Sequence, residues 1–264
     1  MTRHEKPAQP LANTSFQLPD GRSAHGYATG PADARAGVIV IQEWWGLVPH
    51  IADVADRFAA LGYRALAPDL YQGKATVDAD EASHLMGALD FGRAAQEIAA
   101  AAAHLRSTGC ARVAIVGFCM GGALTVIAAT QPGVDAYAAF YGFPPSGAAN
   151  LDAIQIPGLI FFGEKETFFS ITDAKAFAEK QSGRGIATEG ARDAITIRDG
   201  MITGWGGSGI DLTTGGLSEN ALVERVSAIA NVPLTLFFVG LVVALNGASY
   251  EETRAALGEW KARA

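Results

Sequence analysis

A buried strand that runs directly into a Gly-x-Cys-x-Gly turn constrains the fold of this chain more than any other feature. The strand is the apolar, β-branched run at 113–116, and the turn contains Gly117, Cys119 and Gly121. An alanine-containing helix is predicted to follow over 121–130. Small residues two positions before and two after the cysteine prevent clashes where the strand passes the helix. The pattern predicts a sharp strand–turn–helix unit, a nucleophile elbow that presents Cys119.

Strands and helices alternate along the first two-thirds of the chain. By apolar periodicity and turn residues, further strands are predicted at 14–18, 25–29, 38–41, 64–67, 136–141 and 159–162. Further helices are predicted at 51–61, 82–89, 91–105 and 172–180. This alternation predicts an α/β fold whose mostly parallel sheet is covered by helices on both faces. In such sheets, functional groups gather at the carboxyl ends of the strands.

The C-terminal third does not follow this scheme. Residues 182–219 are rich in glycine, and only one weak strand, 194–198, is predicted there. Helices are expected at 217–230 and 250–264. We therefore expect a polar N-terminal tail over 1–13 and a single domain over 14–264, in which 182–248 is an irregular, poorly matched segment.

Composition excludes several classes of protein. A chain of 264 residues with 49% hydrophobic content buries one substantial core, and its net charge of −7 argues against nucleic acid or an anionic membrane as a partner. Residues 1–13 lack the apolar core of a signal peptide, and the apolar run at 232–245 is too short to span a bilayer. Two cysteines fit a reducing compartment. We expect a cytoplasmic protein without membrane contact, either a monomer or a small homo-oligomer.

Cys119 has two interpretations. Most free cysteines are small buried hydrophobes, and a bare Gly-x-Cys-x-Gly string would favour that interpretation. The strand before it and the helix after it favour a nucleophile instead, because the positive helix N-terminus stabilises the reactive thiolate. The backbone N–H of Met120, the next residue, is then placed to bind an oxyanion. Cys110 lacks this context and is expected to be structural.

The loop after the strand at 38–41 reads Gln42-Glu43-Trp44-Trp45-Gly46 and offers further site residues. Glu43 is expected to hold the Cys119 proton or to position the thiol, and the N–H of Trp44 to complete an oxyanion hole. The alternative is that both tryptophans belong to the core and that Glu43 is solvated. Loops at this end of a parallel sheet favour the functional interpretation.

Taken together, these segments resemble the dienelactone hydrolase family of the α/β-hydrolase superfamily. The matching pieces are residues 38–46, the Ala65-Leu66-Ala67-Pro68-Asp69-Leu70-Tyr71 segment, residues 117–123, residues 135–142 and residues 156–163. The resemblance implies hydrolysis of a small ester or lactone through a cysteine acyl-enzyme. It implies that Cys119 is the nucleophile, Glu43 the loop carboxylate, and the amides of Trp44 and Met120 the oxyanion donors. Glu166 occupies the place of the triad acid.

The chain departs from the family pattern at the triad histidine, which is expected after the acid. All five histidines, His4, His25, His50, His84 and His104, precede the elbow. Without an imidazole, no obvious group protonates the leaving group or activates water for deacylation. His50 is the substitute nearest the Glu43 loop, although a helix-start position suits it better. Two functions stay open: a hydrolase with turnover, or an impaired relative that binds or is acylated once.

Cofactors and metals are not expected. No glycine-rich phosphate loop opens a helix after the first strand, and neither Cys-x-x-Cys nor a His/Cys cluster with metal-ligand spacing occurs. The family holds its lactone carboxylate with arginines, and residues 69–90 contain none. The resemblance therefore favours another small-molecule ester or lactone over a dienelactone.

Overall fold

The computed structural model describes residues 7, 9–161, 169–183, 188–189, 195–198, 201–205 and 210–211. The chain divides into two compact units, one of residues 1–159 with 167–170 and one of residues 160–166 with 171–264. Each unit is described by itself. The predicted single domain over 14–264 stays a prediction.

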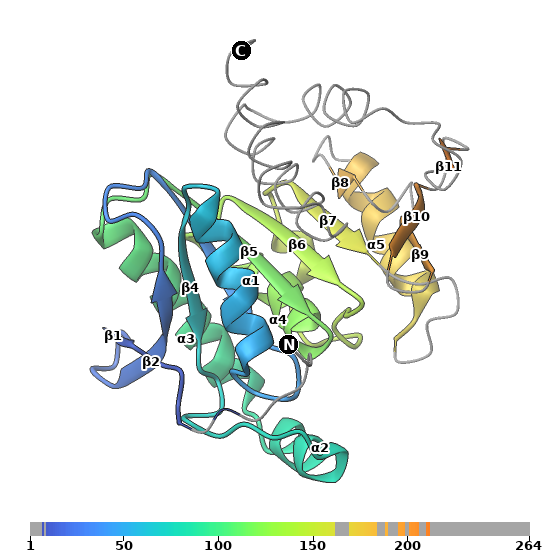
Figure 1. Cartoon of the computed structure of the whole chain (residues 1–264). Helices are drawn as coiled ribbons and strands as arrows, with labels where there is room; N and C mark the ends of the chain where they lie inside the picture. Colours follow the sequence, from blue (N-terminus) through green and yellow to red (C-terminus); the bar gives the residue numbers. More distant parts are fainter. Residues whose placement is uncertain are drawn as a thin grey trace. The chain divides into compact units, whose positions relative to one another are not determined.

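The first unit is built on a mixed sheet with the strand order β1-β2-β4-β3-β5-β6, and β7, the next strand along the chain, is divided between the two units (Figure 1). These strands are β1 (Thr14–Gln17), β2 (Ser23–Thr29), β3 (Ala36–Ile41), β4 (Arg64–Pro68), β5 (Arg112–Phe118), β6 (Ala136–Phe140) and β7 (Gly158–Phe161). Strands β4, β3, β5 and β6 pair in parallel, whereas β1 and β2 form an antiparallel edge. The predicted α/β class with a mostly parallel sheet is confirmed.

Helices cover both faces of this sheet, with α1 on one face and α3 and α4 on the other (Figure 1). They are α1 (Pro49–Ala60), α2 (Ala79–Gly87), α3 (Phe91–Ser107) and α4 (Met120–Ala128). The side chains of Asp78 and Asp90 cap α2 and α3 by accepting from the N–H groups three residues further on. The sequence placed α2 at 82–89; it begins earlier because Asp78 is its cap. Pro49 at the start of α1 fits the first turn, where no N–H is needed.

The core lies between β3, β5 and their covering helices. Residues Val38 to Ile41 of β3 are fully buried, as expected of a central strand in a parallel sheet. The register pairs Ile41 of β3 with Gly117 of β5, and Phe118 of β5 with Phe140 of β6. The carboxyl ends of these strands therefore align, and the residues that follow them meet at one edge.

The second unit contains α5 (Ile171–Gly183), β8 (Thr188–Glu189) and a sheet of β9 (Ile195–Arg198), β10 (Met201–Trp205) and β11 (Ile210–Asp211). Strand β10 pairs antiparallel with both β9 and β11. The predicted strand at 194–198 is confirmed as β9, but β8, β10 and β11 were not predicted. Gly204 inside β10 lowers its strand propensity, and the register shifts between Ile202 and Gly204. No helix in the described part of the chain is long and apolar enough to cross a membrane.

Candidate active site

Cys119 lies between β5 and α4 in a strained backbone conformation, with φ 54° and ψ −119°. A non-glycine residue adopts this region only when the surrounding structure enforces it, and such residues concentrate at functional sites. The N–H of Cys119 donates to the Phe140 carbonyl at 2.9 Å, and the Cys119 carbonyl accepts from Gly122 at 2.9 Å. The side chain is half-buried at the N-terminus of α4. The predicted elbow geometry is therefore present.

Close backbone packing explains the glycines around the elbow. A methyl group on Gly117 would overlap the Gly121 carbonyl, and one on Gly121 would overlap the carbonyl of Gln42. One on Gly142, after β6, would overlap the Cys119 carbonyl oxygen. The elbow, the loop after β3 and the end of β6 are thus packed backbone against backbone, with no room for a Cβ atom.

The predicted oxyanion donors lie on the two segments that meet here. Trp44 is half-buried in the loop after β3, and Met120 is the first residue of α4. Outside the bonds internal to helices and strands, neither amide donates to another residue in the described ranges. Trp44 and Trp45 pack edge to face, with ring centroids 5.0 Å apart, and Thr76 N–H donates to the Trp45 carbonyl at 3.0 Å. These contacts hold the loop, and neither tryptophan is a core residue.

Glu43 is half-buried, and the hydroxyl of Tyr141 donates to its Oε1 at 3.0 Å. Tyr141 follows β6 with a positive φ of 38°, directly after Phe140, whose carbonyl accepts from Cys119. The Tyr141 ring also lies 6.2 Å from the Phe118 ring. The loop carboxylate is thus tied to the segment that holds the elbow. Tyr141 lies in residues 135–142, one of the segments that match the family, but the sequence did not predict its contact with Glu43. Its position at the carboxyl end of a strand was the available signal.

Tyr71 is a second tyrosine that sequence reasoning gave no role. Its hydroxyl, on the loop after β4, lies 3.3 Å from the Met120 sulfur and donates to it. Burial raises the pKa of Tyr71, and the negative charge of the Cys119 thiolate raises it further. The phenol therefore stays protonated at neutral pH beside the elbow.

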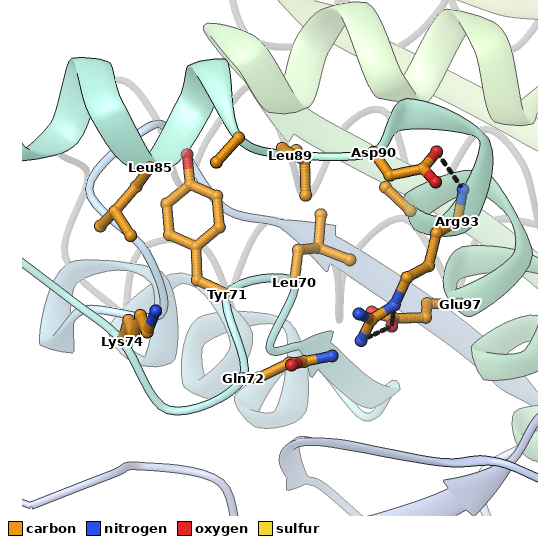
Figure 2. Close-up of a pocket in the computed structure, with 11 residues that line it drawn as sticks. Leu70, Tyr71, Gln72, Lys74, Leu85, Leu89, Asp90, Arg93 and Glu97 are labelled. Atoms are coloured by element: carbon orange, nitrogen blue, oxygen red, sulfur yellow. Dashed lines mark hydrogen bonds and ion pairs between the residues drawn. The ribbon is translucent and has the colours of Figure 1, made fainter.

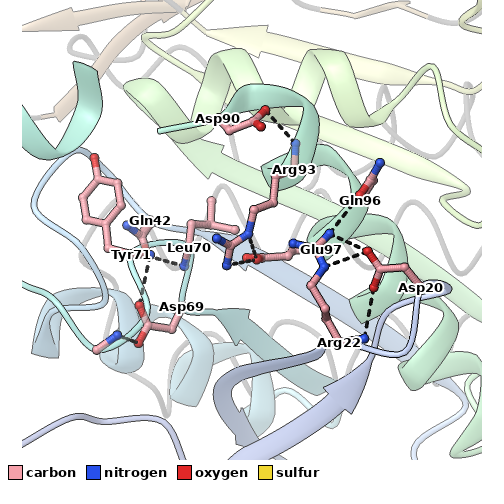
Figure 3. A network of polar contacts seen from close by, with 11 residues as sticks. Asp20, Arg22, Gln42, Asp69, Leu70, Tyr71, Asp90, Arg93, Gln96 and Glu97 are labelled. Atoms are coloured by element: carbon pink, nitrogen blue, oxygen red, sulfur yellow. Dashed lines mark hydrogen bonds and ion pairs between the residues drawn. The ribbon is translucent and has the colours of Figure 1, made fainter. Parts of the chain in front are cut away.

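Buried polar side chains hold the backbone of the loop after β4 (Figure 3). Asp69 accepts from the N–H groups of Tyr71 at 3.3 Å and Gly73 at 2.6 Å, and Gln42 Oε1 accepts from Leu70 N–H at 3.2 Å. Gln42 is fully buried, and its Nε2 has no hydrogen-bond partner in the described part of the chain. Gln42 thereby joins the loop after β4 to the residue that precedes Glu43.

The described histidines are spread over the first unit. His25 is exposed on β2, His84 is exposed on α2, and His104 on α3 lies 5.9 Å, centroid to centroid, from the Phe16 ring. Burial lowers the pKa of His104. His50 is half-buried in the first turn of α1, which confirms its helix-start position. His4 and the predicted triad acid Glu166 lie outside the described residues.

A cavity of about 170 Å³ lies beside the loop after β4, between it and the α2–α3 corner (Figure 2). Its apolar wall comes from Leu70, Tyr71, Leu85 and Leu89, and its polar side includes Arg93 and Glu97. Cys119 does not line this cavity. Tyr71 does, and its hydroxyl also contacts Met120 of the elbow.

Two charged side chains on the polar side of the cavity, Arg93 and Glu97, pair with each other. The Arg93 Nε donates to Glu97 Oε1 at 2.8 Å, and Asp90 caps the helix that carries both. Burial raises the pKa of Glu97, against the lowering effect of the Arg93 charge. Arg93 lies just beyond residues 69–90, where the sequence had offered no arginine, and its guanidinium is engaged by Glu97.

The fold defines an α/β-hydrolase-type protein with a cysteine at the strained turn between β5 and α4. The model of the dienelactone hydrolase family matches residues 24–189, and the chain belongs to this family. The resemblance found in the sequence is thereby confirmed, as is the expectation of a carboxylic-ester hydrolase at the level of the family.

Relatives and solved structures agree with this placement. The "Protein usf" of Aquifex pyrophilus is 33% identical over 178 residues, which is 63% of this chain and 77% of the relative. The "Putative carboxymethylenebutenolidase" of Aquifex aeolicus is 34% identical over 160 residues, 56% of this chain and 69% of the relative. The crystal structure of a dienelactone hydrolase-like promiscuous phosphotriesterase from metagenomic libraries has 26% identity and a TM-score of 0.56, covering 66% of this chain and 78% of its own.

Proposed function

We propose that this protein hydrolyses small esters or lactones through a covalent acyl-enzyme on Cys119. The observation that carries the proposal is the strained backbone of Cys119 at the junction of β5 and α4, with its side chain half-buried. Such strain persists only where the fold enforces it, and a helix N-terminus favours the thiolate. The names of the relatives, carboxymethylenebutenolidase among them, agree with a carboxylic ester or lactone as substrate.

The proposed reaction begins when Cys119 loses its proton to Glu43, directly or through water, and the thiolate attacks the substrate carbonyl carbon. A carbon–sulfur bond forms while the carbonyl oxygen becomes an oxyanion, held by the amides of Trp44 and Met120. The carbon–oxygen bond to the leaving group then breaks, and the departing oxygen takes up the proton that Glu43 received from Cys119. Water then attacks the thioester carbonyl carbon, the carbon–sulfur bond breaks, and the carboxylic acid leaves while the Cys119 sulfur takes up a proton from that water.

Glu43 suits the first proton transfer because Tyr141 fixes it. The hydrogen bond from the Tyr141 hydroxyl orients one carboxylate oxygen and leaves the other for a proton. Glu166 is proposed as a further acidic member, on the strength of its position in the family motif alone.

The second candidate function is a single acylation without turnover. The positions of the histidines favour this function. His104 lies before β5, whereas the elbow lies at the other end of that strand, and His25 and His84 are exposed. No histidine follows residue 104 in the sequence. Turnover would need a substitute base, and His50, which lies closest along the chain to the Glu43 loop, is the candidate that the sequence leaves. If it does not act, the thioester on Cys119 accumulates.

Kinetics of p-nitrophenyl acetate cleavage test the acyl-enzyme. We expect a burst of p-nitrophenol equal to one equivalent per active protein, lost in Cys119→Ala and kept in Cys110→Ala. A burst that survives in Cys119→Ala would overturn the proposal, because another group would then carry the acyl chain.

Intact mass measurement after the burst separates the two candidates. An acetyl adduct on Cys119 that decays at the steady-state rate supports hydrolysis with turnover. An adduct that persists while p-nitrophenol release stops supports single acylation. His50→Gln then tests the substitute base: slower decay of the adduct with an unchanged burst assigns deacylation to His50, and unchanged decay removes it from the mechanism.

A further inference from the structure

Tyr71 joins the elbow to the cavity beside it, and it has no place in the reaction as described so far. Its side chain is buried, 6% exposed, on the loop that follows β4. On one side its hydroxyl meets the Met120 sulfur, and on the other its ring lines the cavity of about 170 Å³ (Figure 2). A ring next to a cavity has fewer packing partners than one in a close-packed core.

The backbone around Tyr71 is fixed more firmly than its ring. Asp69 accepts from the Tyr71 N–H and the Gly73 N–H, while Gln42 holds the Leu70 N–H (Figure 3). These bonds fix the backbone of Tyr71, but they do not hold the hydroxyl end of its ring. The hydroxyl–sulfur hydrogen bond is therefore the contact that fixes the tip of the ring.

The same bond acts on Met120. The Met120 sulfur can only accept a hydrogen bond, and the protonated Tyr71 phenol donates to it. Burial, together with the charge of the Cys119 thiolate, raises the pKa of Tyr71, so the phenol remains a donor while the thiolate forms. Met120 is 5% exposed and supplies the backbone amide of the proposed oxyanion hole from the first turn of α4.

We propose that Tyr71 is a positioning residue of the Cys119 site, whose hydroxyl holds the Met120 side chain and thereby the oxyanion-binding amide. Tyr71 makes no bond to the substrate, and no proton moves through it. This inference rests on the proposed function for its effect on rate, and on the hydroxyl–sulfur contact for its geometry.

A double-mutant cycle tests the effect on rate. Tyr71→Phe removes the donor and keeps the ring, and Met120→Leu removes the acceptor, keeps the amide and approximates the size. Each variant is expected to slow the p-nitrophenol burst by about 3- to 10-fold and to keep KM within about 2-fold. The reason is that the Met120 amide, once displaced, stabilises the oxyanion of the transition state less well. The double variant should be no slower than the slower single variant, because both remove one interaction.

Tyr63→Phe is the matched control. Tyr63 is buried to a similar degree, 9% exposed, and burial raises its pKa too, but it precedes β4 at the opposite end of that strand. It should leave the burst unchanged. Rate losses in the double variant that multiply, or a Tyr71→Phe variant that matches Tyr63→Phe in burst rate, would overturn the inference.

Methyl NMR tests the contact without any turnover. The sequence has only four methionines, so protein labelled with ¹³C at the methionine methyl groups gives a spectrum in which Met120→Leu identifies the Met120 signal. That signal should move in Tyr71→Phe and stay in place in Tyr63→Phe; an unmoved signal in Tyr71→Phe refutes the contact. If wild-type protein shows no Cys119-dependent burst while the signal moves, the proposed function fails and the contact stands.

Discussion

The two cysteines flank the same strand and show how much its two ends differ. Cys110 precedes β5, is 2% exposed, and its sulfur donates to the Ala34 carbonyl at 3.5 Å. Burial raises its pKa. Cys119 follows β5, is half-buried, and lies at the N-terminus of α4 in a strained backbone conformation.

The surroundings of a thiol therefore depend on which end of a parallel strand it occupies. At the amino end, α3 leads into β5 through a closed turn in which the Cys110 N–H donates to Leu105, and the thiol fills space. At the carboxyl end, loops from β3, β4 and β6 converge and α4 begins, and the Met120 N–H in its first turn donates to no carbonyl in the described ranges. The residue type is the same, and the proposed function requires that only the second environment stabilises a thiolate.

Removal of each thiol is expected to give the largest contrast between the two cysteines. Cys119→Ala should reduce the p-nitrophenyl acetate burst by a factor of about 1,000 or more, because the nucleophile is lost. Cys110→Ala should stay within about 2-fold in rate and cost about 1 kcal/mol of unfolding free energy, because a buried sulfur leaves a small void. Burst kinetics and urea unfolding measure the two effects. A burst lost in Cys110→Ala but not in Cys119→Ala would reverse the comparison.

The pH dependence of alkylation distinguishes the two thiols directly. Because burial raises the pKa of Cys110 above its ordinary 9.0, its thiolate is scarce below that pH, and its alkylation should rise only in more alkaline solution. In native protein at pH 7.5, iodoacetamide should modify Cys119 about 100-fold faster than Cys110. Intact mass would show one adduct in native protein and two after unfolding in urea. Equal rates in native protein would show that the elbow does not activate its thiol.

Backbone packing gives the next largest contrast. Gly142→Ala inserts a methyl group against the Cys119 carbonyl, so it should lower the burst rate by about 10- to 100-fold and destabilise the fold by about 2–4 kcal/mol. Gly87→Ala is the control, because a Cβ atom there meets no other atom within 4 Å and alanine favours the helix. It should keep the burst and hold or raise the thermal midpoint. A Gly142→Ala variant with normal burst and stability would disprove the close packing.

The smallest expected effect concerns Glu43. Tyr141→Phe removes the hydrogen bond that orients this carboxylate and should slow acylation by about 3- to 10-fold. Tyr27→Phe is a matched control, because Tyr27 on β2 donates to the exposed Asp56 carboxylate at 2.9 Å. That variant should retain wild-type burst kinetics. Equal losses in the two variants would indicate a general effect of losing a hydroxyl.

Sequence reasoning reached the strands and the elbow because both leave local patterns. The buried run at 38–41, the strand before Cys119 and the helix after it follow from burial and turn chemistry over a few residues. Strands β8, β10 and β11 were missed because they are short or contain glycine, so pairing rather than propensity defines them. The roles of Glu166 and of residues 212–264 stay predictions, since they lie outside the described residues.

The position of Cys119 at a strand–helix turn could be read from the sequence, because that geometry depends on neighbours two positions away along the chain. The side chains around the turn could not, because they come together only in the folded sheet. Tyr141 reaches Glu43 across 98 positions and Tyr71 reaches Met120 across 49, through the pairing of β4, β3, β5 and β6. No local pattern encodes such contacts, since they arise from the register of the sheet, which aligns the carboxyl ends of strands from distant parts of the chain.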